Sequence, residues 1–139
     1  MADIIVVEAS IAAAANATTD RGTAGDTITQ GQPVYLDATT STYKRADADD
    51  TAVTADCVGI ALNSVLSGQP IDFIKAGTLT VGAGGTPPVV GRVYVVSGTV
   101  GRIADVADLA SNDWTTVVAI GLTSTTIKVG INVSGVQVP

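Results

Sequence analysis

The chain has 139 residues, a net charge of −6 and one cysteine, Cys57. It therefore fits a single domain, lacks the basic surface that nucleic acid requires and forms no internal disulfide bond. Hydrophobic residues make up 46% of the chain, mainly Val, Ile, Leu and Ala, but no apolar run approaches the length of a membrane span. Because Val, Ile and Thr favour strands, the composition predicts an all-β fold with neither a nucleic-acid nor a membrane partner.

The first 27 residues form a candidate N-terminal arm. Residues 4–7 fit a strand, residues 8–17 a short Ala-rich helix, and the polar residues 18–26 a loop. An apolar arm of this kind either docks on a neighbouring subunit or closes its own barrel, and the sequence leaves both alternatives open. The candidate contacts with a neighbouring subunit or with another protein are Ile4, Ile5, Val6, Val7 and Ile11.

Four short motifs recur in the same order in the two halves of the chain. In the first, Gly31-Gln32-Pro33-Val34-Tyr35 is echoed by Val90-Gly91-Arg92-Val93-Tyr94, which pairs two tyrosines 59 positions apart. We interpret the series as an internal duplication in residues 28–139, with copies over 28–81 and 89–135. The Gly- and Pro-rich residues 82–88 are the expected linker. The alternative is chance similarity between sequences rich in Val, Gly and Thr.

Each copy predicts the same strands in the same order. A hairpin is expected over 34–36 and 42–45 in the first copy and over 93–96 and 100–103 in the second. A buried strand follows at 58–62 or 116–122, and a last strand at 71–75 or 125–129. Asp105 is placed to cap one helical turn over 105–110. The expected fold is a compact β-barrel or sandwich built from two tandem related β units behind the arm.

The sequence offers no constellation of residues for catalysis. It contains no His, which removes the usual general base near neutral pH and the commonest metal ligand. Cys57 follows Asp56 at the start of a buried strand and is expected to be a core residue. The cluster of Asp47, Asp49 and Asp50 lacks the Gly and the distant Glu of a calcium loop. We expect a solvated loop there and no catalytic, metal or cofactor site.

A further acidic group consists of Asp105, Asp108 and Asp113, for which a solvated loop is again the expected reading. Residues 81–88 are rich in Gly but lack the Gly-Lys-Ser/Thr sequence of a phosphate-binding loop. Neither segment therefore predicts a binding site. We expect the chain not to be an enzyme.

A last set of segments carries a family pattern: 31–37, 43–48, 58–62 and 68–71 in the first half of the chain, and 91–95, 103–110 and 131–135 in the second. Together they resemble the capsid decoration, or cement, proteins of tailed bacteriophages, and the resemblance covers about residues 25–139. It implies a β-rich, usually trimeric protein that sits over local symmetry axes of the mature capsid, bridges neighbouring capsomers and has no active site. The expectation is a homotrimer bound to the major capsid protein on the virion surface, assembled in the cytoplasm of the bacterial host.

Two other functions compete with virion stabilisation. One is a receptor- or glycan-binding module of a head or tail fibre, which exposed aromatic side chains would support. The chain has only five aromatic residues, and these are Tyr35, Tyr43, Phe73, Tyr94 and Trp114. The other is a small carbohydrate-active enzyme that uses paired Asp residues, which the near absence of Glu disfavours.

Overall fold

The computed structural model describes residues 3–4, 6–84 and 86–139. Within these residues the chain forms ten strands and two single-turn 3₁₀ helices, which confirms the predicted all-β fold. The first five strands are β1 (Ala12–Ala13), β2 (Thr18–Thr23), β3 (Pro33–Asp37), β4 (Thr42–Arg45) and β5 (Cys57–Ala61). The others are β6 (Pro70–Thr80), β7 (Val93–Val96), β8 (Ile103–Asp105), β9 (Trp114–Gly121) and β10 (Thr126–Gln137). The 3₁₀ helices are η1 (Glu8–Ser10) and η2 (Val106–Asp108).

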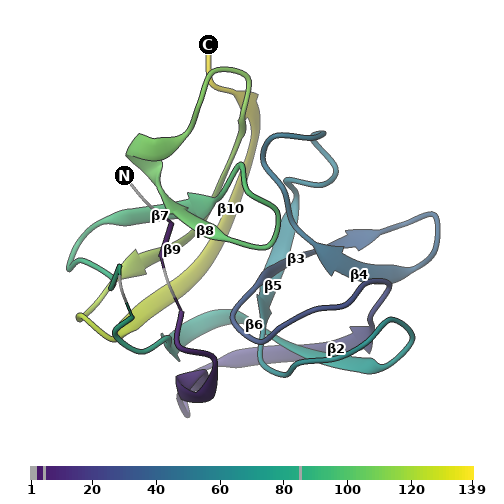
Figure 1. Cartoon of the computed structure of the whole chain (residues 1–139), viewed down its shortest axis with the longest axis horizontal. Coiled ribbons are helices and arrows are strands. Elements are labelled where there is room, and N and C mark those ends of the chain that lie inside the picture. Colours follow the sequence, from purple (N-terminus) through teal and green to yellow (C-terminus); the bar gives the residue numbers. More distant parts are fainter. Residues whose placement is uncertain (1–2, 5, 85) are drawn as a thin grey trace.

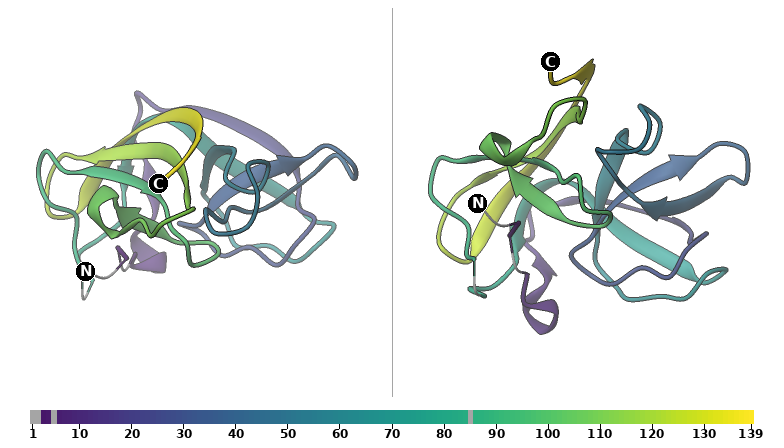
Figure 2. Two further views of the ribbon diagram at one scale, coloured as in Figure 1. Left: turned by 90° about the horizontal axis from the view of Figure 1, so that it is seen from above. Right: turned by 45° about the horizontal axis from the view of Figure 1, so that its top comes forward.

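Two four-strand units with the same connectivity make up the sheet. The strand order is β4-β3-β5-β6-β10-β9-β7-β8, so the order of β3–β6, called unit 1, is repeated in reverse by β7–β10, called unit 2. The last strands of the two units, β6 and β10, pair antiparallel at the centre. Figure 1 shows unit 1 in blue and teal beside unit 2 in green and yellow, joined by the long β6. Viewed from above, the two units lie side by side (Figure 2).

Backbone geometry repeats between the units at a constant separation of 60 positions. The Gly31 N–H donates to the Ala61 carbonyl at 2.8 Å, and the Gly91 N–H donates to the Gly121 carbonyl at 2.8 Å. Both glycines have positive φ, +91° and +78°, a conformation that glycine adopts without steric cost. The ladders β3–β5 and β7–β9 also carry a register shift at the corresponding place. The two units are therefore tandem copies of one β motif.

The backbone register corrects the first motif pair of the sequence by one position, from a separation of 59 to one of 60. Tyr94 lies opposite Ala119 on β9, whereas the residue opposite the equivalent Gly59 on β5 is Val34. Tyr35 therefore corresponds to Val95 and not to Tyr94. The sequence comparison matched Tyr35 with Tyr94 because the two residues are identical. Backbone register is set by turns and bulges, which such a comparison does not detect.

One hydrophobic core joins the units, and a smaller one lies inside unit 1. The smaller core consists of Ala24, Ile28, Val34, Ala61, Val65, Ile71 and Phe73. In the larger core, Ala46, Ala48, Cys57, Ile60 and Ile74 of unit 1 pack with Tyr94, Val96, Ile103, Val118, Ala119, Ile127 and Val129 of unit 2. β5 and β6 contribute side chains to both cores, so each of these strands has buried residues on both of its faces.

Hydrogen bonds also join the two units beyond the β6–β10 ladder. The Ala48 N–H donates to the Ser97 carbonyl at 3.0 Å, and the Trp114 N–H donates to the Ala48 carbonyl at 2.8 Å. The hydroxyl of Thr116, whose side chain is buried, donates to the Ala55 carbonyl at 2.5 Å. These bonds tie the loop after β4 to the start of β9.

The N-terminal region differs from its prediction in three places. Residues 4, 6 and 7, which the sequence predicts as part of a strand, belong to no strand. Residues 18–23, predicted as a loop, form strand β2 along one edge of β6. The predicted helix over 8–17 is reduced to the single turn of η1, after which β1 pairs with the end of β6. The long β6 offers an unpaired edge, and its backbone hydrogen bonds outweigh the weak helical preference of an Ala-rich segment and the polarity of a Thr-rich one.

Candidate functional site

The N-terminal arm packs against its own barrel. The Ile4 side chain is 4% exposed and belongs to the larger core, and the Ile4 N–H donates to the Ile103 carbonyl at 2.8 Å. Farther along, the Val7 N–H donates to the Val81 carbonyl at 2.8 Å. Val6 and Ile11 are half-buried against the same core. In this structure the arm closes its own barrel, which was one of the two alternatives.

The proposed contact residues of the arm therefore differ in their access to solvent. Ile4 is buried, while Val6, Val7 and Ile11 are half-buried. Ile5 lies outside the described residues. Contact between Val6, Val7 or Ile11 and another chain stays a prediction.

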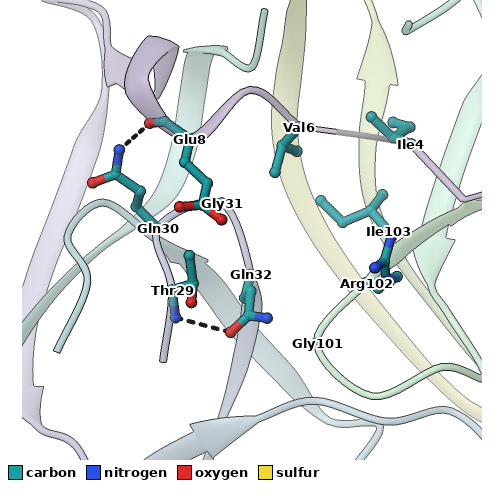
Figure 3. A pocket seen from close by; sticks show the side chains of 10 residues that line it. All are labelled: Ile4, Val6, Glu8, Thr29, Gln30, Gly31, Gln32, Gly101, Arg102 and Ile103. Atoms are coloured by element: carbon teal, nitrogen blue, oxygen red, sulfur yellow. Dashed lines mark hydrogen bonds between the residues drawn. The ribbon is translucent and has the colours of Figure 1, made fainter. Parts of the chain in front are cut away.

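A pocket of about 280 Å³ lies between the arm and the turns of both units (Figure 3). Its described lining consists of Ile4, Val6, Glu8, Thr29, Gln30, Gly31, Gln32, Gly101, Arg102 and Ile103. Among these residues only Glu8 carries a carboxylate and only Arg102 a positive charge. The side-chain amide of Gln30 donates to the carbonyl of Glu8, so one wall of the pocket holds the arm in place. The lining offers neither paired carboxylates nor a nucleophile next to a base.

The acidic loop after β4 is organised by its own backbone. A carboxylate oxygen of Asp47 accepts the Asp49 N–H at 3.0 Å, which closes a local turn. Asp49 and Asp50 point to solvent, whereas Asp47 is half-buried, and this burial raises the pKa of the Asp47 carboxyl above its ordinary value. In the described part of the chain, no three His, Cys, Asp or Glu side chains gather closely enough to hold a metal ion.

The second acidic group stabilises turns. Asp105 caps η2 by accepting the Ala107 N–H at 2.9 Å and forms an ion pair with Arg92 at 2.8 Å. Asp113 is 4% exposed and accepts the Ala110 N–H at 2.9 Å. The predicted cap at Asp105 is confirmed. The predicted solvated loop is therefore wrong for these two carboxylates, because both are buried. Both bind backbone N–H groups between β8 and β9, and Asp105 also pairs with Arg92, just before β7.

Cys57 is 1% exposed at the start of β5. Burial raises the pKa of its thiol to about 12, and the Sγ–H donates to the Gly59 carbonyl at 3.3 Å. A thiol with this pKa is protonated and poorly nucleophilic at neutral pH. Its surroundings match the predicted core role.

Sequence reasoning missed four exposed aliphatic residues on two neighbouring backbone segments of unit 2, which we call the apolar patch. Its members are Val89, Val90, Ile120 and Leu122, with side chains 45%, 70%, 46% and 40% exposed. The Gly91–Gly121 hydrogen bond brings the two segments together, and the ideal Cβ position of Gly121 lies 2.0 Å from the Val89 carbonyl oxygen. The two adjacent valines Val89 and Val90 could have indicated this patch in the sequence, but the sequence analysis places them at the start of the second β copy and does not consider their exposure.

Aromatic side chains form no exposed platform. Tyr35, Phe73 and Tyr94 are buried, and Tyr43 and Trp114 are half-buried. Tyr43 packs on Phe73 with ring centroids 4.7 Å apart. The large apolar side chains that are exposed in the described residues are all aliphatic.

The sequence matches neither any model of a known protein family nor any curated protein. In the described residues, no helix has the length and apolar character needed to cross a membrane.

Proposed function

We propose that this chain is a non-enzymatic decoration, or cement, protein that binds the outer surface of a phage capsid as an oligomer and stabilises the virion. The observation that carries the proposal is the apolar patch on an otherwise acidic protein. Contiguous exposed aliphatic side chains commonly mark sites of protein–protein interaction. The resemblance of residues 25–139 to capsid cement proteins supports the same function.

The rest of the described chain fits a scaffold better than a catalyst. Asp105 and Asp113 hold turns, Asp47 organises its loop, and Cys57 is buried as a neutral thiol. A cement protein needs a rigid body with a contact surface, and two β units sharing one core provide such a body. A glycan-binding module gains no support, because none of the five aromatic side chains is fully exposed.

Binding to capsids tests the proposal directly. Purified protein is mixed with capsids that lack decoration, and bound protein is measured after sedimentation of the shells. We expect saturable binding and a rise in the temperature at which the capsids release their DNA. Bovine serum albumin at the same concentration is the control for non-specific adsorption. Binding that does not saturate, or an unchanged release temperature at full occupancy, contradicts the proposal.

A further inference from the structure

We propose that the apolar patch of unit 2 binds an extended aliphatic segment of a partner protein, in the way that unit 1 binds the N-terminal arm of its own chain. The inference rests on the proposed function, which makes the capsid subunit the source of that segment. It follows from a comparison of two equivalent surfaces in one molecule, of which one is covered and the other is bare.

The covered surface surrounds Gly31 in unit 1. A Cβ placed on Gly31 would lie 2.9 Å from Val6 Cγ2 and 3.1 Å from Ile11 Cδ1, so two aliphatic side chains of the arm rest on this turn. The Gln30 amide fixes the arm by donating to the Glu8 carbonyl. Figure 3 shows the arm passing beside the turn, with Glu8 next to Gln30 and Val6 farther along the arm.

The bare surface surrounds Gly91 in unit 2. Its turn has the same backbone: the Arg92 N–H donates to the Val89 carbonyl at 3.1 Å, as the Gln32 N–H donates to the Thr29 carbonyl at 3.2 Å. A Cβ placed on Gly91 would have no heavy atom within 4 Å. In the described residues, therefore, no segment of the chain rests on Gly91 as Val6 and Ile11 rest on Gly31.

The side chains around the bare turn are more apolar than those around the covered one. Thr29 and Gln30 of unit 1 are replaced by Val89 and Val90 at the equivalent positions of unit 2. Yet Thr29 and Gln30 are half-buried, whereas Val89 and Val90 are exposed. If exposure alone decided the residue types, the more exposed turn of unit 2 would carry the polar residues, because apolar area in water is unfavourable. The composition of unit 2 therefore fits a surface that is covered in use.

The strand beside each turn shows the same contrast. Ile60 on β5 is fully buried, and the equivalent Ile120 on β9 is 46% exposed. Leu62 is half-buried, and the equivalent Leu122 is 40% exposed. Ile60 lies in the core shared with unit 2, against which Val6 and Ile11 of the arm also pack, whereas Ile120 is exposed. Both positions nevertheless keep an aliphatic residue in unit 2.

The occupant is assigned to a different protein for two reasons. A second copy has no spare arm, because its own Ile4 is buried in its core and its Val7 N–H is bonded to Val81. Two copies that met patch to patch would also bring together two molecules of net charge −6. Since Val90 has no amide to replace that of Gln30, the partner segment is held mainly by apolar contacts, which favours small β-branched side chains.

The test uses the full-length protein and a peptide of its own arm sequence, residues 3–13, as the probe. The Gly31 site is already occupied by the arm, so a fluorescent peptide is expected to bind saturably at the Gly91 site. We expect Val90→Asp to weaken binding at least about tenfold, because it puts a charge where an aliphatic contact forms. Val53→Asp is the matched control, since Val53 is 60% exposed in the loop before β5. Ile120→Ser is a second variant, and circular dichroism confirms that each variant is folded.

Each outcome decides the matter. Absence of peptide binding, or equal binding to the wild-type and Val90→Asp proteins, overturns the inference. If sedimentation of the peptide-free protein shows an oligomer that Val90→Asp dissociates, a second copy occupies the patch and the inference is again overturned. Capsid binding is measured in parallel. Capsid binding without peptide binding leaves the proposed function standing and overturns the inference. Peptide binding without capsid binding overturns the proposed function and, with it, the capsid subunit as the occupant of the patch.

Discussion

At the scale of single residues, Gly121 is required by a contact with the loop before β7. A Cβ at this position would lie 2.0 Å from the Val89 carbonyl oxygen and 2.8 Å from the Val89 carbonyl carbon. We expect Gly121→Ala to destabilise the protein by about 1–3 kcal/mol, because backbone atoms must move to admit the methyl group. Urea denaturation measures the change. Gly130→Ala is the matched control, since a Cβ there would have no heavy atom within 4 Å. Equal stability of the two variants would contradict the close approach.

Asp47 is a carboxylate that opposes folding when it is ionised. Burial raises the pKa of its carboxyl in the folded chain above the ordinary value of 3.8, so the unfolded chain releases this proton more readily. The resulting penalty is present above that ordinary value and disappears as the pH falls below it. We expect Asp47→Asn, which keeps the oxygen that accepts the Asp49 N–H, to raise the urea midpoint at pH 7. Little change is expected near pH 3. Asp56→Asn on the exposed surface is the control, and a gain that persists in acid would contradict the mechanism.

The structural role of a single residue could be predicted from the sequence where its bonding partner is close in the chain. The Asp105 cap is visible in the sequence because the bonded Ala107 N–H lies two residues away. The constraint on Gly121 comes from Val89, which is far away in sequence, and no local pattern reports it. The apolar patch was missed for the same reason. The segments that carry Val89 and Ile120 are far apart in sequence and come together only through backbone contacts such as the Gly91–Gly121 hydrogen bond.

At the scale of elements, β6 explains the main errors in the N-terminal region. The prediction ended this strand at residue 75, but β6 continues to Thr80. The extra length provides the edge on which β1 pairs, and its earlier part holds β2. Strand β4 was predicted with its observed bounds, because turn residues flank it closely. The polar β2 has no alternating pattern and is a strand only because β6 lies beside it.

The arm is an element whose role in folding can be measured with one substitution. Ile4 is 4% exposed among core residues of both units. We expect Ile4→Ala to lower the free energy of unfolding by about 2–5 kcal/mol through lost burial and the cavity that remains. Urea denaturation of the full chain gives the value. Leu66→Ala is the control, because Leu66 is 60% exposed and its truncation is expected to change stability by less than about 0.5 kcal/mol. A neutral Ile4→Ala variant would mean that the arm is not part of the folded barrel in solution.

At the scale of the whole molecule, two units with the same strand order differ in what covers them. One face of unit 1 forms its own small core, and the other face, with Cys57 and Ile60, closes the core of unit 2. Unit 2 has no third unit on its outer side, so Ile120 stays exposed. The order of motifs in the sequence indicated the duplication, but the asymmetry depends on how the second copy folds against the first and is absent from any local pattern.

The shared core predicts that the two units unfold together. Separation of unit 2 would expose Ile60 and Ile74 on unit 1 and would break the β6–β10 ladder, so neither half keeps its buried area alone. We expect a single calorimetric transition whose calorimetric and van't Hoff enthalpies agree. Fragments 1–84 and 86–139 are expected to lack the near-ultraviolet circular dichroism of the intact chain when each is studied alone. The Thr116→Val variant, which removes the hydroxyl that donates to Ala55, should lower the midpoint without splitting the transition. Two resolved transitions, or a fragment that folds by itself, would show that the units are independent and that the core between them is an interface between two domains.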